Sequence, residues 1–255
     1  MIEVRELHEM PELERVYALF DDIWHFGSAD PPITMELMRA LSHAGGYVAG
    51  AFDGGRMVGA SVGFLAAGGA LHSHVTGSIA GRGIGFELKQ HQRRWALERG
   101  LTHITWTYDP LVRRNAHFNL AKLGARPAEY LPCFYGVMED AINQGDESDR
   151  LLASWPLTAP HVEALARREP GERTPVPEGA VVALADEGGR PVPGPVDAPV
   201  VLVAVPPDIE GLRRADRGAA KAWRHAVRDV LGGLMAEGRA VTGFAAKSYY
   251  VVERL

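Results

Sequence analysis

The chain lacks the features that mark secreted proteins. It has a single cysteine, Cys133, among 255 residues, so no disulfide can form within it. Its first residues, MIEVRELHEM, lack the basic and then apolar pattern of a signal peptide. These two absences predict a cytoplasmic protein.

Positive charge is also scarce. Lys and Arg together number 27 against 32 Asp and Glu, which gives a net charge of -5. Nucleic-acid-binding domains normally carry a basic surface, so we expect no nucleic-acid partner.

One long segment carries no charge at all, because no Asp, Glu, Lys or Arg lies between Arg56 and Arg82. Its length would suffice for a membrane span. The segment is rich in glycine, however, and it contains His72 and His74. These residues fit two strands joined by a turn better than a bilayer helix, so we expect no membrane partner.

Strand and helix patterns alternate through the first half of the chain. Apolar residues at helical spacing predict helices at residues 10–24, 34–43, 84–99 and 112–123. Strand patterns cover residues 2–7, 47–53, 56–66, 70–79, 101–108 and 130–138. The second, third and fourth of these strands are separated by glycine turns, which predicts an antiparallel meander followed by a βαβ crossover.

The second half gives weaker signals. Residues 141–178 are rich in Pro, Gly and acidic residues and read as a linker. Strand patterns at 181–186 and 199–206, a long helix at 209–237 and one or two strands in 242–255 follow. They predict a C-terminal α/β region at residues 179–255.

Three glycines, Gly81, Gly83 and Gly85, stand where the meander ends and a helix begins. A dinucleotide-binding loop, G-x-G-x-x-G, would need its last glycine where Phe86 stands, and a P-loop would need Lys followed by Ser or Thr. Both loops are excluded. Backbone N–H groups of such a cluster can cradle a phosphate at a helix N-terminus, and the same glycines can also serve only as a tight turn.

Several longer motifs accompany this cluster in a fixed order. They are LHSH (71–74), GRGIG (81–85), WTYDPL (106–111), RNAHFNLAKLGA (114–125), YGVMEDAINQG (135–145) and DRL (149–151). With these motifs, residues 1–140 resemble the GNAT superfamily of acyl-CoA-dependent N-acyltransferases. The resemblance implies an α/β fold with a mixed, mostly antiparallel twisted sheet flanked by helices, followed here by the C-terminal α/β region.

The resemblance also implies a co-substrate, acetyl-CoA or another acyl-CoA such as succinyl-CoA, and no metal. In the family, the glycine loop holds the pyrophosphate of coenzyme A, and the strand before it pairs with the pantetheine arm. Carried over to this chain, these residues are Gly81, Arg82, Gly83, Ile84 and Gly85 in the loop, and Ser73, His74 and Val75 in the strand. The acceptor is expected to be a small-molecule amine, with amino acids as the first class to consider, and a homodimer is one option for the assembly.

Two positions depart from the family pattern. The loop usually begins with Gln or Arg where this chain has Ala80. Many members place a tyrosine, which reprotonates the leaving thiolate, where this chain has Leu120. A GNAT-like module that binds acyl-CoA without turnover is therefore the rival hypothesis.

Acyl transfer to an amine needs a proton acceptor, a donor for the thioester oxyanion and a proton for the thiolate. His72 and His74 on the strand before the loop are candidates for the base, with hydrogen-bonded structural histidines as the alternative. Asp109, at the end of its strand, is another candidate, with a strand-capping Asp before Pro as the alternative.

The remaining candidates lie further along the chain. For the acid, the sequence offers without ranking Tyr108, Tyr135, His117 and Cys133. Asn115 and Asn119, four residues apart on one helix, could bind the pantetheine amides or face solvent. The C-terminal region is expected to cover the acceptor site.

Overall fold

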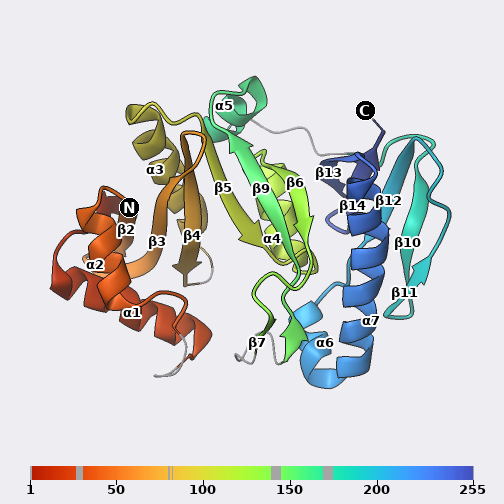
Figure 1. The fold of residues 1–255 in the computed structure, drawn as a ribbon, viewed down its shortest axis with the longest axis horizontal. Helices are drawn as coiled ribbons and strands as arrows, with labels where there is room; N and C mark the ends of the chain where they lie inside the picture. Colours follow the sequence, from red (N-terminus) through yellow and green to blue (C-terminus); the bar gives the residue numbers. More distant parts are fainter. Residues whose placement is uncertain are drawn as a thin grey trace. The chain divides into compact units, whose positions relative to one another are not determined.

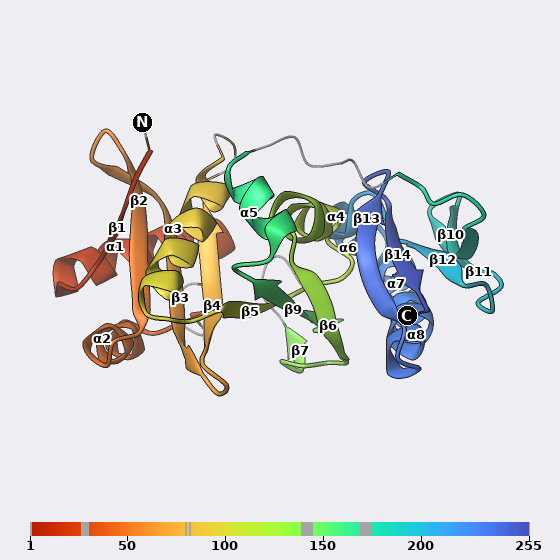
Figure 2. The same ribbon diagram turned by 90° about the horizontal axis from the view of Figure 1, so that it is seen from above.

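The computed structural model describes residues 2–26, 31–79, 81, 83–138, 145–168 and 175–254. The chain divides into two compact units, whose course can be followed in Figures 1 and 2. Unit 1 comprises Met1–Trp106 and Pro156–Thr158, and unit 2 comprises Thr107–Trp155 and Ala159–Leu255.

Unit 1 is a sheet with helices on both faces. Its elements are β1 (Ile2–Glu6), α1 (Met10–Trp24), α2 (Met35–His43), β2 (Tyr47–Asp53), β3 (Arg56–Ala66), β4 (Ala70–Ser78), α3 (Ile84–Glu98) and β5 (His103–Tyr108), whose last residues belong to unit 2. The strands follow the order β1-β2-β3-β4-β5. All neighbours are antiparallel except β4 and β5, which are parallel. The predicted meander and crossover are confirmed.

Local signals in the sequence set the helix starts of unit 1. The Thr34 side chain accepts a hydrogen bond from the backbone N–H of Leu37 and caps α2. Glu9 and Glu12 form a capping box at α1. Each cap satisfies backbone N–H groups that have no partner within the helix, so these helices begin where the sequence predicted.

Two apolar layers hold the helices on the sheet. Val48 and Phe52 of β2 pack in one cluster with the α1 residues Leu13 and Phe20. A second cluster contains another residue of β2 and a residue of β3, packed with Ile84 and Leu88 of α3. Side chains of a strand alternate between its faces, so α1 and α3 cover opposite faces of the sheet, as Figure 2 shows.

Unit 2 contains a second sheet and the remaining helices. Its first part has α4 (Arg113–His117), the π-helical turn η1 (Phe118–Lys122), β6 (Arg126–Leu131), β7 (Val137–Met138), β8 (Asp146–Glu147), β9 (Arg150–Pro156) and α5 (Pro160–Ala166). Its second part has β10 (Val181–Glu187), β11 (Arg190–Pro193), β12 (Val200–Ala204), α6 (Ile209–Ala215), α7 (Arg217–Val227), the π-helical turn η2 (Arg228–Gly232), α8 (Gly233–Ala236), β13 (Ala240–Ala245) and β14 (Tyr249–Glu253).

The C-terminal strands form one sheet with the order β11-β10-β12-β14-β13, and α7 runs along it (Figure 1). In the first part of the unit, β9 pairs antiparallel with β6. The predicted fold class, a mixed and mostly antiparallel sheet flanked by helices with a C-terminal α/β extension, is confirmed. Within the described residues, every helix is too short or too polar to span a bilayer.

Some predicted elements differ from the structure. The strand expected over residues 130–138 is interrupted, because the chain turns at Cys133, which adopts a positive φ of 45°. The long helix expected over residues 209–237 is broken at Asp216, whose side chain accepts from the N–H of Ala219 and starts α7 anew. The strand β9 and the helix α5 were not predicted.

Close packing of α3 on the sheet depends on Gly59 of β3, where an added Cβ would lie 2.7 Å from Ile84 Cγ2. We therefore expect Gly59→Val to lower the free energy of unfolding by about 1–3 kcal/mol through overpacking, measured by urea denaturation. The control is Gly233→Ala in α8, where a Cβ meets nothing within 4 Å. That variant should be neutral or stabilise by up to about 1 kcal/mol, and an equal loss in both would contradict the packing argument.

Candidate functional site

The ladder between β4 and β5 is short. It pairs Ala70–His72 with His103–Thr105, whereas β4 continues to Ser78. Beyond His72, the edge of β4 that faces β5 is therefore outside this ladder. A row of strand N–H and C=O groups at such an edge can pair with an extended ligand.

A β-bulge lies directly at this point. On the other edge of β4, Ser73 pairs with Gly63 and Val75 pairs with Val62, which leaves His74 as an extra residue. A bulge takes one residue out of the ladder and re-aims the neighbouring groups. The end of the β4–β5 ladder and the bulge thus coincide.

The two predicted histidines lie on one aromatic face. The Phe64 ring centroid is 5.1 Å from that of His72 and 5.9 Å from that of His74. His72 Nδ1 lies 3.0 Å from Thr105 Oγ1 across the last pair of the ladder. Burial lowers the pKa of His72, and His74 and Lys89 lower it further, so the ring is neutral at pH 7.

His74 has a defined tautomer when neutral. Its Nε2 lies 3.0 Å from the carbonyl oxygen of Pro32, which can only accept a hydrogen bond. Nε2 therefore carries the hydrogen, and Nδ1 keeps a lone pair in the neutral ring. Both histidines have hydrogen-bond partners, as structural histidines do, and their role as base stays a prediction.

The glycine turn adopts backbone conformations that favour glycine. Gly81 and Gly83 have φ values of 89° and 71°, and an added Cβ at either would meet nothing within 4 Å. Gly83 caps α3 without any side-chain hydrogen bond. The first N–H groups of α3 thus lack a side-chain cap at Gly83, and such groups suit an anion.

The other loop residues contribute in different ways. Gly85 lies within the first turn of α3. Ile84 is 1% exposed and its side chain belongs to the core, so only its backbone can serve a ligand. Arg82 lies outside the described residues, and so does Ala80, the position that differs from the family pattern.

A buried polar cluster connects α3 to the strands, and sequence reasoning missed it. Lys89 of α3 donates from Nζ to Ser73 Oγ at 2.9 Å and to Gln92 Oε1 at 3.2 Å. Its Nζ also lies 4.0 Å from the centroid of the Trp106 ring. Burial lowers the pKa of Lys89 from its ordinary 10.5 to about 7. Lys89 and Gln92 share a helix face with Ala96, a spacing that the sequence does not distinguish from a solvated face.

The side chains of the two remaining β4 residues of the predicted site, Ser73 and Val75, pack against other parts of unit 1. Ser73 is 3% exposed and its hydroxyl accepts from Lys89. Val75 is partly buried against the apolar cluster that joins α1 and α2 to the sheet. Their side chains are therefore taken up by the protein, and their backbone remains the part that could serve a ligand.

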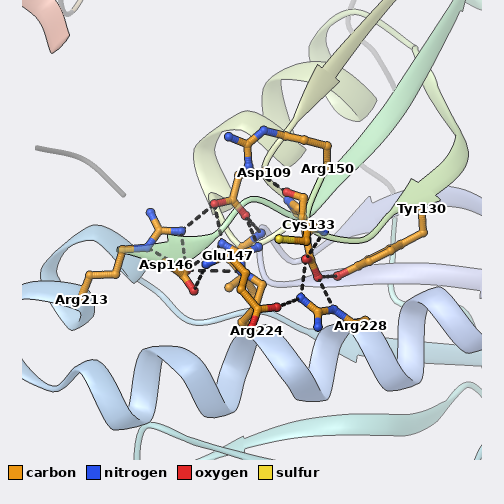
Figure 3. A network of polar contacts seen from close by, with 12 residues as sticks. Asp109, Tyr130, Cys133, Asp146, Glu147, Arg150, Arg213, Arg224 and Arg228 are labelled. Atoms are coloured by element: carbon orange, nitrogen blue, oxygen red, sulfur yellow. Dashed lines mark hydrogen bonds and ion pairs between the residues drawn. The ribbon is translucent and has the colours of Figure 1, made fainter. Parts of the chain in front are cut away.

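In unit 2, Asp109 belongs to a buried ion network rather than standing free (Figure 3). Arg224 donates to both of its carboxylate oxygens at 2.8 Å, and Arg213 donates at 2.7 Å. Both arginines also contact Asp146. Burial alone would raise the pKa of Asp109, but Arg224 and Arg213 outweigh it and hold this pKa well below its usual range.

This geometry favours the structural alternative for Asp109 over a role as general base. A general base works best with a pKa near the working pH and a free lone pair, and Asp109 has neither. Asp109 is therefore better described as a structural residue, which is held by an ion network rather than acting as a simple strand cap. The same figure shows Arg228 of η2 donating to Asp149 and Glu147. With Arg213 and Arg224 on Asp146, the network ties α6, α7 and η2 to the β8 region.

The acid candidates of unit 2 occupy different surroundings. Tyr108 is 5% exposed, and burial raises its pKa, with the Tyr250 hydroxyl as a neighbour. Tyr135 is 45% exposed, and its hydroxyl lies 3.1 Å from Thr107 Oγ1. His117 has a lowered pKa, because of burial and of Lys247 and Lys122. Tyr135 is thus the more accessible of the two tyrosines.

The two asparagines do not share one environment. Asn119 is 4% exposed and lies in η1, whereas Asn115 is half-buried in α4. Leu120, at the place of the expected tyrosine, is 4% exposed. The predicted site residues of unit 2 are thus spread over α4, η1, β5 and the turn before β7, and their functions stay predictions.

Similar solved structures report on the fold. The ribosomal-protein-S18-alanine N-acetyltransferase from Escherichia coli has 13% identity and a TM-score of 0.50, covering 62% of this chain and 94% of its own. An N-acetyltransferase from Staphylococcus aureus Mu50 has 14% identity and a TM-score of 0.50, covering 62% and 99%. The yncA protein of Salmonella typhimurium, solved with its cofactor acetyl-CoA, has 14% identity and a TM-score of 0.50, covering 62% and 95%.

The chain has the GNAT acetyltransferase fold. This likeness confirms the fold expected from the sequence, and at these identities it is a statement about the fold alone. Comparison with protein-family models and with curated proteins gives no match.

The ion network leads to a prediction about stability. Asp109→Ala would leave Arg213 and Arg224 buried with a missing counter-charge, so we expect a loss of about 3–5 kcal/mol in the free energy of unfolding. The control is Glu210→Gln, which removes the ion pair with Arg114, a side chain that is 69% exposed. That change should cost at most about 1 kcal/mol. Urea denaturation of both variants measures the difference, and similar losses would contradict a structural role for Asp109.

The lowered pKa of Lys89 makes stability depend on pH. The unfolded chain keeps this proton up to pH about 10.5, whereas the folded protein releases it at about 7. The unfolded state therefore binds more protons between these values, and the Lys89 contribution makes the folded state more stable as pH rises through this window. Lys89→Met removes this contribution, so the variant should gain most over the wild type at pH 6 and least at pH 10. A difference in Tm that does not change with pH would contradict the assignment.

Proposed function

We propose that the protein is an acyl-CoA-dependent N-acyltransferase. It transfers an acetyl or succinyl group to the amine of a small molecule, with amino acids as the first acceptors to try, by direct attack in a ternary complex. The observation that carries this proposal is the coincidence, within unit 1, of the ladder end, the bulge at His74 and the uncapped glycine turn of α3.

Each of these features matches one part of an acyl-CoA. Gly81–Gly85 would hold the pyrophosphate through backbone N–H groups and the dipole of α3. The edge of β4 at Ser73–Val75 would pair with the amides of the pantetheine arm as an added strand would. Acyl-CoA supplies the activated thioester, and the chain supplies the cradle and the edge.

Proton transfer falls to side chains of β4. His72, neutral at pH 7, and His74, with a lone pair on Nδ1, would take the proton of the attacking amine directly or through a water. Backbone N–H groups at the bulge would donate to the oxyanion that develops on the thioester. For the thiolate we keep Tyr135 and Tyr108 as candidates, with Tyr135 preferred because it is exposed.

The C-terminal region is proposed to shape the acceptor site. Its helices α6 and α7 are fixed to Asp109 and to the β8 region by buried arginines of unit 2. The GNAT-type solved structures above are covered over nearly their whole length by 62% of this chain, so the rest of the chain is additional to them. An added region that is tied by buried ion pairs suits a role in selectivity.

One observation favours the rival function, an acyl-CoA-binding module without turnover. Leu120 is buried where the family places its thiolate-protonating tyrosine. Steady-state thiol release from acetyl-CoA and succinyl-CoA, with a panel of D- and L-amino acids as acceptors, separates the two. Stabilisation by CoA in a thermal-shift assay without any thiol release would establish the module instead.

The glycine turn provides a matched pair of variants. Gly83 and Gly100 both have a φ of 71°, and a Cβ at either would meet nothing within 4 Å. Asparagine tolerates this conformation, so Gly83→Asn and Gly100→Asn should both fold. The side chain at position 83 would stand over the first N–H groups of α3, and we expect CoA affinity to fall at least about tenfold, which is ~1.4 kcal/mol. Calorimetry measures it; Gly100→Asn should bind as the wild type does, and retained affinity in Gly83→Asn would mean that the turn is only a turn.

A further inference from the structure

Lys89 is a buried lysine whose head group has uncharged partners. It is 5% exposed, and the contacts of its head group within the described residues are Ser73, Gln92 and Trp106. An ammonium group has three N–H donors, and these partners account for all of them, two by hydrogen bonds and one by the ring face. The head group is therefore fixed in place and has no donor left for a ligand.

This arrangement is costly for the fold. Burying a lysine without a counter-charge costs several kcal/mol, and a methionine or leucine would fill the same space without that cost. Local violations of this kind are expected where function requires them. The location of Lys89 indicates what that function is.

The contacts of Lys89 surround the bulge at His74. Ser73 and Trp106 are the first residues on β4 and β5 after the last pair of their ladder, His72 with Thr105. Beyond Lys89, Gln92 donates to Ser61 Oγ at 3.3 Å, and Ser61 Oγ lies 2.8 Å from Thr76 Oγ1. One chain of hydrogen bonds thus reaches β4 on both sides of His74.

We infer that Lys89 is a positioning residue of the acyl-transfer site, whose head group holds the bulge at His74 and the parting of β4 from β5 in the shape that receives the thioester. This inference rests on the proposed function. Lys89 does not touch the substrate; it acts through Ser73 and Trp106. The shape is favoured by the protonated head group, because a neutral amine loses the attraction to the Trp106 ring.

Few other charges face this head group. From β4, His72 is the titratable neighbour, and its pKa is lowered partly by Lys89. From β3, α3 and β5, the groups in the cluster are Ser61, Gln92 and Trp106, which do not titrate. Burial is the cause of the lowered pKa of Lys89, whereas burial, His74 and Lys89 together lower the pKa of His72.

The test compares kcat and KM of Lys89→Met with the wild type from pH 6 to pH 9. Acetyl-CoA and the best acceptor of the amino-acid panel are the substrates. Methionine keeps the length of the side chain and removes the charge and the donors. At pH 6 we expect kcat to fall at least about tenfold while KM for acetyl-CoA stays within about threefold, because a misplaced oxyanion donor affects the transition state more than binding.

The pH dependence of kcat distinguishes a positioning role from a merely structural one, which would leave this dependence unchanged. The ratio of wild-type kcat to that of Lys89→Met should fall as pH rises through about 7, since the wild-type head group loses its charge there. Titration of the acceptor cancels in this ratio. Lys221→Met, which removes an exposed lysine of α7, should match the wild type at every pH.

A second variant protects the test against misfolding. Ser73→Ala removes one partner of Lys89 and should also lower kcat, and the loss in the double variant should be smaller than the sum of the two single losses. If the wild type turns over and the ratio of its kcat to that of Lys89→Met is near one at all pH values, the inference is overturned and the proposed function stands. Losses in kcat that add up in the double variant would have the same meaning. A wild type that neither binds CoA nor releases thiol would overturn both.

Discussion

The early end of the parallel ladder between β4 and β5 is the constraint on which unit 1 depends. Pairing stops at His72 and Thr105, although β4 runs on to Ser78. Unpaired strand edges expose polar backbone groups, which proteins avoid unless they are covered or used. Here the end of pairing coincides with a bulge on the other edge of β4 and precedes the glycine turn into α3. Each feature by itself is ordinary, and their position on or directly after one strand defines the candidate site.

Buried charge is treated in opposite ways in the two units. In unit 2, Asp109 and Asp146 share Arg213 and Arg224, so each buried charge faces an opposite one and the network holds the C-terminal helices. In unit 1, the partners of Lys89 among the described residues are neutral. A balanced network is the usual form of structural burial, whereas an unbalanced charge in a polar cluster is more typical of functional sites.

Much of the fold could be predicted from the sequence because local signals agree with tertiary packing. Thr34 caps its helix, and the glycine turns separate the strands of the meander as expected. The errors came where a long-range contact decides. β9 gains its place by pairing with β6, which lies outside its own segment. The break in the helix of residues 209–237 is different, because Asp216 caps the new start through a local contact with Ala219 that the helical pattern had masked. Residue patterns over one element do not carry this information.

The sequence by itself determined the order of strands and helices in the first half, the glycine turn before α3 and the resemblance that predicts an acyl-CoA site there. Those features depend on residue type and on neighbours a few positions away. Only the tertiary structure decided that Asp109 is tied by two arginines, that His74 is the extra residue of a bulge and that Lys89 is buried. A side chain's pKa and partners depend on the groups that folding brings near it from elsewhere in the chain, and for this reason the chemistry of the site could not be predicted from the motifs.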